Sequence, residues 1–134
     1  MAAYGYVYDL TAITGQIVAG GTNVIFSNTG PIVNETHVDG TDSVTVGLDG
    51  DYQIDYSVII TVGVGSEIAI AVNGGVVEAS TRIVAVVATG PVTGQAILTL
   101  TAGDVITLNN PSGTAFTTSA SPDVGAQMTI DKLN

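Results

Sequence analysis

The residue types that most often carry catalysis or bind metals are scarce in this sequence. It holds one histidine and no cysteine, which excludes disulfides, zinc–thiolate sites and thiol nucleophiles. His37 stands in a polar stretch, residues 34–42, and no motif pairs it with a nucleophile. We therefore interpret it as an exposed loop histidine rather than a general base. Because no nucleophile, base and oxyanion donor can be assembled, we expect no enzymatic activity.

Two pairs of carboxylates are the next candidates for chemistry. Asp49 with Asp51, and Asp39 with Asp42, could serve in acid–base work or in a calcium site. Each pair flanks a glycine, and Asp-Gly is ordinary turn chemistry. Neither pair has the alternating ligands and closing glutamate of an EF-hand loop. We expect no cofactor, with calcium bound by some of these carboxylates as the alternative.

The aromatic residues form a clearer pattern. Tyr4, Tyr6 and Tyr8 alternate with smaller residues, so a strand at this position places all three on one face. Such a stripe could stack against sugars, line a subunit interface or pack in the core. We take the three as candidates for a trimer interface and leave the other two roles open. Tyr52 and Tyr56 are expected in the core.

Composition limits the partners and the class of protein. The 134 residues are 46% hydrophobic and 10% charged, with a formal net charge of −10. Nucleic acid is an unsuitable partner because its binding depends on neutralised phosphates, and anionic lipid is disfavoured for the same reason. No run of 18 apolar residues and no signal-peptide pattern occurs, so we expect no membrane insertion. Residues 1–134 are expected to form one domain, excised from a longer protein.

Period-two alternation dominates the chain and is strongest in Gly50–Val62, where apolar residues occupy every second position from Tyr52 onward. No segment has the period or the caps of a helix. Residues 27–31 form a cluster of strand breakers, and residues 34–42 are expected to be an exposed loop. The alternation predicts about ten strands in an antiparallel jelly-roll sandwich. The other expected strands cover residues 4–8, 23–26, 44–48, 67–72, 76–80, 83–88, 94–100, 105–109, 115–118 and 125–133.

The order of several motifs resembles a known family. The motifs are Ala3-Tyr4-Gly5-Tyr6-Val7-Tyr8, the segment from Val18 through Phe26 to Pro31, Gly50-Asp51-Tyr52-Gln53-Ile54-Asp55-Tyr56-Ser57-Val58, Ile70-Ala71-Val72-Asn73-Gly74, residues 100–108, and Met128-Thr129-Ile130-Asp131-Lys132-Leu133. Together they are similar to the C-terminal domain of bacterial collagen-like spore-surface glycoproteins of the exosporium. The resemblance implies a ten-stranded jelly roll of the C1q and tumour-necrosis-factor type, assembled as a homotrimer. It also implies an upstream collagen-like stalk, display on the spore exosporium and no catalytic residues. Calcium sites of some C1q-type heads match no motif here.

The expected function is therefore that of a structural trimerisation head. An apolar chain with few charges has more hydrophobic strand surface than a monomer of this size hides comfortably, which agrees with an oligomer. The alternative is a recognition module that binds a carbohydrate or a host receptor through residues 34–42 and 110–123. A phage or virion fibre tip is a third possibility, because it would have the same kind of composition and strand pattern.

Overall fold

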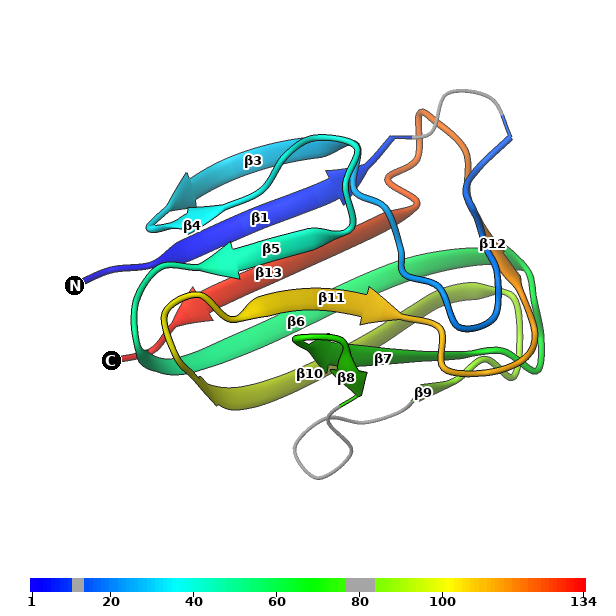
Figure 1. The fold of residues 1–134 in the computed structure, drawn as a ribbon. Coiled ribbons are helices and arrows are strands. Elements are labelled where there is room, and N and C mark those ends of the chain that lie inside the picture. Colours follow the sequence, from blue (N-terminus) through cyan, green and yellow to red (C-terminus); the bar gives the residue numbers. More distant parts are fainter. Residues whose placement is uncertain (11–13, 77–83) are drawn as a thin grey trace.

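In the computed structural model, which describes residues 1–10, 14–76 and 84–134, two antiparallel β-sheets pack face to face (Figure 1). Within these residues no helix is long and apolar enough to span a membrane. The all-β jelly-roll prediction is confirmed. The strands are β1 (Tyr4–Asp9), β2 (Ile17–Val18), β3 (Asn28–Val33), β4 (Glu35–Thr36), β5 (Ser43–Val46), β6 (Gly50–Val62), β7 (Glu67–Val72), β8 (Gly75–Val76), β9 (Val84–Ala85), β10 (Gly90–Leu100), β11 (Val105–Asn109), β12 (Phe116–Thr118) and β13 (Ala126–Lys132).

Strand β6 organises the first sheet, as its long alternating pattern predicts. One side of β6 pairs with β13 and then with β12, and the other side pairs with β10. The described strands of this sheet run in the order β2-β12-β6-β13-β1-β3, with β10 on the free side of β6. The second sheet has the order β4-β5-β11-β7-β8, with β9 also on β7. Both chain termini lie at one end of the sandwich (Figure 1).

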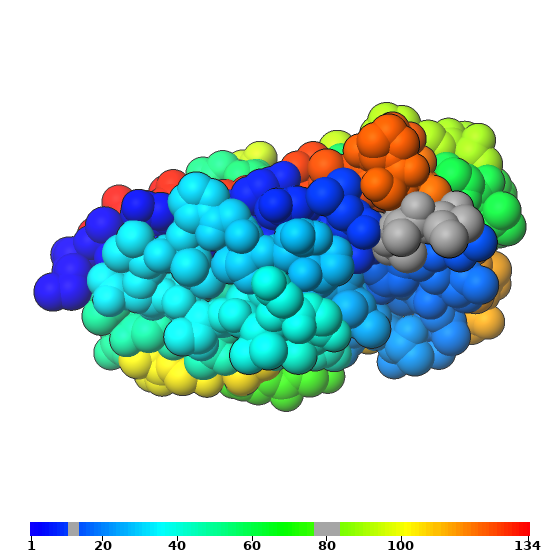
Figure 2. All heavy atoms as spheres, turned by 90° about the horizontal axis from the view of Figure 1, so that it is seen from above, coloured from blue at the N-terminus to red at the C-terminus, as the bar shows by residue number. Residues whose placement is uncertain are grey.

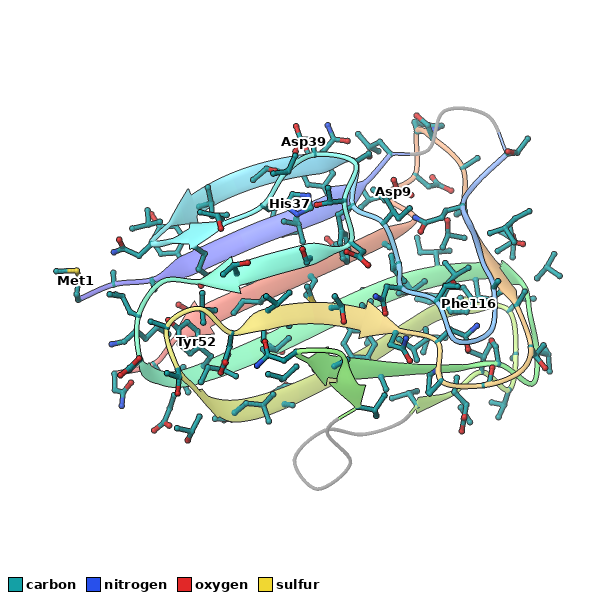
Figure 3. All side chains as sticks on the ribbon, viewed as in Figure 1. Met1, Asp9, His37, Asp39, Tyr52 and Phe116 are labelled. Atoms are coloured by element: carbon teal, nitrogen blue, oxygen red, sulfur yellow. The ribbon has the colours of Figure 1, made fainter. Side chains whose placement is uncertain are left out.

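The core is built from the inward-facing residues of both sheets. Along β6 every second side chain from Tyr52 to Ile60 is buried, which confirms that Tyr52 and Tyr56 belong to the core. Tyr52 lies toward the end that holds the termini, and Phe116 fills the opposite end (Figure 3). Because each strand buries only its inner face, the outer face of the first sheet keeps the polar half of the pattern.

The breaker cluster at residues 27–31 is not a loop, contrary to the sequence prediction. Most of it belongs to β3, which among the described strands pairs only with β1, at the edge of its sheet. The register of that pairing shifts between Gly5 and Val7, opposite Gly30 and Pro31. A proline is tolerated there because an edge strand with a local irregularity does not need its missing N–H.

The expected exposed loop at residues 34–42 is also only partly correct. Glu35 is buried in β4, which pairs with β5, and His37 is half-buried, whereas residues 38–41 are exposed. Residues 23–26 form two isolated bridges rather than a strand. The strands expected at 76–80 and 83–88 fall partly on residues 77–83, outside the described part of the chain; β8 and β9 cover their described ends.

Candidate assembly surface

The outer face of the first sheet places polar and aromatic residues in rows across four strands. Cross-strand partners point to the same face, so the pairing registers of β1, β13, β6 and β10 define each row. One row is Tyr8, Gln127, Ser57 and Thr93, and the next is Tyr6, Thr129, Asp55 and Gln95. All eight side chains are half-buried or exposed in the single chain. We call these eight residues the outer-face rows.

Tyr6 is held firmly within these rows. Its hydroxyl donates a hydrogen bond of 2.7 Å to Gln127 Oε1, and its ring stacks on Tyr8 with centroids 5.2 Å apart. A Cβ atom at Gly30 would lie 2.6 Å from Tyr6 Cδ2, so the glycine makes room for the ring. Burial, followed by the neighbouring Tyr8, raises the pKa of the Tyr6 hydroxyl. The stripe is therefore a preorganised aromatic platform on the sheet.

A hollow of about 370 Å³ lies beside this platform, over β13, β6 and β10. Six of the outer-face rows' side chains line it, together with Tyr56 and Gly94. The Tyr56 ring fills the core below, and burial raises the pKa of its hydroxyl to about 12. The lining thus offers amides, hydroxyls and one carboxylate, Asp55, to whatever covers the face.

The three predicted interface tyrosines all lie on this outer face. Tyr4 is 40% exposed, while Tyr6 and Tyr8 are half-buried. The alternative that the stripe packs in the sandwich core is therefore wrong, since Val7 and its inward neighbours occupy that side. The hollow was not predicted from the sequence. Its only signal was the set of polar residues that alternate with the core positions of β6 and β13.

His37 is not positioned as a general base. Its Nδ1 lies 2.8 Å from the Ser43 carbonyl oxygen and its Nε2 lies 3.0 Å from the Phe26 carbonyl oxygen. The ring also packs edge-on against Phe26, with centroids 6.3 Å apart. The role of the side chain is therefore structural: it holds the segment after β4 against the chain near Phe26.

The candidate calcium ligands are engaged in protein hydrogen bonds. Asp49 accepts from the Ala102 amide, and Asp51 from the Thr99 hydroxyl. Asp39 accepts from Thr29, and Asp42 from Asn23. Among the described residues no three His, Cys, Asp or Glu side chains gather as a metal-binding group. The calcium alternative stays a prediction that a binding measurement must test.

The two-sheet order and the strand connections define a jelly roll of the C1q and tumour-necrosis-factor class, and solved structures agree. The globular domain of zebrafish complement 1qA is 14% identical with a TM-score of 0.67, covering 100% of this chain and 98% of that chain. Murine APRIL is 18% identical with a TM-score of 0.59, covering 99% and 100%. The PRD1 vertex protein P5 is 16% identical with a TM-score of 0.60, covering 98% and 97%. At these identities the likeness shows the fold alone.

The family is more specific. The BclA C-terminal domain matches residues 5–134, nearly the whole chain, and this chain belongs to that family. The resemblance noted from the sequence motifs is thereby confirmed. No curated protein matches the chain in sequence.

Proposed function

We propose that this chain is a non-enzymatic trimerisation head of a collagen-like filament protein of the spore exosporium. C1q/TNF-like domains form homotrimers, and the BclA C-terminal domain follows a collagen-like region. The observation in this chain that carries the proposal is the outer face of the first sheet. It places a tyrosine stack and a hollow side by side on one broad surface.

The chemistry of that face suits contact between protein chains. The cores of protein interfaces are poor in charge and rich in aromatic residues. The outer-face rows carry two tyrosines and a single carboxylate, although the whole chain has a net charge of −10. Most of the acidic surplus therefore lies outside these rows, and self-association through the rows brings few like charges together.

The position of the termini suits a stalk. Both ends of the chain lie at one end of the sandwich (Figure 1). In a parallel trimer the three N-termini would leave on the same side, so collagen-like segments joined to them would start in register. The opposite end of the head would then point outward from the spore surface.

A glycan or receptor partner is the second candidate, and the hollows are the observation that favours it. Besides the larger hollow, a smaller one of about 170 Å³ lies over residues 36–45, at His37. The other expected binding stretch is less available, because Asn110 and Phe116 are both buried. A glycan array probed with the assembled head tests this role separately from assembly.

The proposed function is tested by fusing a Gly-Pro-Pro repeat segment before Met1 and following triple-helix formation by circular dichroism. The head should promote the triple helix and raise its melting temperature. Thr129→Asp adds a carboxylate to the middle of the outer-face rows, next to Asp55, and should abolish this effect. Thr45→Asp makes the same change at a half-buried threonine of the other sheet and is the control. Equal triple-helix stability with both variant heads would contradict the proposal.

A further inference from the structure

A buried glutamate lies where β4 meets the first strand. Glu35 is 6% exposed, and among the described residues neither of its carboxyl oxygens has a hydrogen-bond partner. Glu35 pairs with Val46 of β5, and its side chain extends from the second sheet toward the first. A buried acid without partners is uncommon, because losing the hydration of its charged form is costly.

The carboxyl group lies directly under the start of β1. A Cβ atom on Gly5 would lie 2.5 Å from Glu35 Oε1, so a side chain at residue 5 would push the carboxyl group out of this position. Gly5 is also the point where β1 pairs with Ile32 of β3 and Ile130 of β13. Seen from above, the cyan segment that holds β4 lies beside the dark blue N-terminal strand (Figure 2). Glu35 thus touches the strand that carries the chain into the head.

The ionisable groups around Glu35 are acids. The exposed Asp131 of β13 is near enough for its charge to raise the pKa of Glu35, and Tyr52 of β6 lies close enough for the glutamate charge to affect the phenol. Asp49, in the turn before β6, lies near the same phenol. The inward positions of β1 and β3 beside the carboxyl are Gly5 and Ile32, which carry no charge. The Lys132 ammonium donates to the Asn134 carbonyl instead.

We infer that Glu35 is a proton-dependent clasp, which holds the start of β1 against the second sheet when protonated and releases it when ionised. A neutral carboxyl fits a dry site between the sheets, whereas an unpaired carboxylate there must recruit water. Water reaches it most directly by parting β4 from β1 at the end that holds the termini. The clasp does not depend on the proposed trimer, since all of its groups belong to one chain.

The direction of the pH effect follows from the site. Burial, and then the Asp131 charge, raises the pKa of Glu35 from its ordinary 4.5 to about 8. An acid whose pKa is higher in the fold stabilises the fold fully below the ordinary value, and this contribution is lost as pH rises toward the folded value. Between pH 4.5 and about 8 the equilibrium constant for opening should rise by up to about tenfold per pH unit.

Carbon-13 NMR of the glutamate carboxyl groups tests the inference on the unmodified protein. One carboxyl resonance should titrate near pH 8, and the Gly5 and Ile130 amide signals should shift with the same midpoint. Titration of all three glutamates at ordinary acidic pH would overturn the proposal. So would a carboxyl step near pH 8 that leaves the Gly5 amide unchanged.

A variant pair measures the effect on stability. Glu35→Gln removes the titrating proton and should make the urea midpoint nearly independent of pH between about 5 and 8, where the unmodified protein loses stability. Glu67→Gln, at the half-exposed start of β7, should keep the pH dependence. Equal pH dependence in all three proteins would overturn the clasp. If Glu35→Gln does not fold, the NMR titration decides.

Discussion

Gly94 shows how a missing side chain sets the spacing between β10 and the core. Gly94 of β10 is the cross-strand partner of Tyr56 in β6, so the two residues lie on the same, inner side of the sheet. A Cβ atom at residue 94 would lie 2.5 Å from Tyr56 Cε2 and closer still to Cζ and Oη. Real carbon contacts begin near 3.5 Å, so Gly94→Ala forces the ring or the β10 backbone to move by about 1 Å.

These contacts determine how much unfolding free energy Gly94→Ala removes. Overpacking a core by one methyl group typically costs about 1–3 kcal/mol. Displacing the ring also weakens the 3.4 Å bond from the Tyr56 hydroxyl to the Ile68 carbonyl, which joins the two sheets and is worth about 1 kcal/mol at most. Gly94→Ala should therefore lower the free energy of unfolding by about 1–4 kcal/mol. This is a large share of the roughly 5–15 kcal/mol that stabilises a typical domain.

Urea unfolding followed by circular dichroism measures this loss. Gly75→Ala is the control, because a Cβ atom there meets only the Val72 carbonyl oxygen at 3.7 Å. In a Tyr56→Leu background the added methyl group has space, so Gly94→Ala should cost at least about 1 kcal/mol less than in the parent. If the losses of unfolding free energy from Gly94→Ala and Tyr56→Leu simply add, within about 0.5 kcal/mol, in the double variant, the steric argument is refuted.

Three other side chains make contacts whose loss can be measured directly. Tyr6→Ala removes the stack on Tyr8 and the hydrogen bond to Gln127. In sedimentation, the midpoint concentration of trimer dissociation should rise at least about tenfold. An unchanged midpoint would exclude Tyr6 from the interface. Asn110→Ala leaves the Val18 and Thr114 carbonyls without their buried donor. In chemical unfolding, the free energy of unfolding should fall by about 2–4 kcal/mol. A fall below about 1 kcal/mol would be inconsistent with these hydrogen bonds. Spectrophotometric titration should find one tyrosine, Tyr56, that ionises only near pH 12, and its replacement by phenylalanine should remove that step.

The sequence predicted best what depends on local alternation. The inward side of β6 was correctly assigned because apolar residues occupy every second position without a break from Tyr52 to Ile60. The outward orientation of the tyrosines follows from the same period, although the sequence alone could not tell which face of the strand meets the core.

What the sequence could not predict depends on contacts between distant segments. Pro31 looks like a breaker, yet it lies in an edge strand opposite a register shift that only the pairing with β1 reveals. Glu35 sits in a polar run, and its burial follows from Gly5, thirty positions earlier, which leaves space for the carboxyl group. The hollow on the outer face is formed by three strands that are not consecutive in sequence.

The most direct test of the account is the solution mass of the domain, measured by light scattering over a range of concentrations and then through a thermal ramp. We predict a mass three times that of the 13.4 kDa chain, which falls only as the β-sheet circular dichroism signal is lost. A mass of one chain at all concentrations, with the sheets intact, would contradict trimerisation through the outer face of the first sheet.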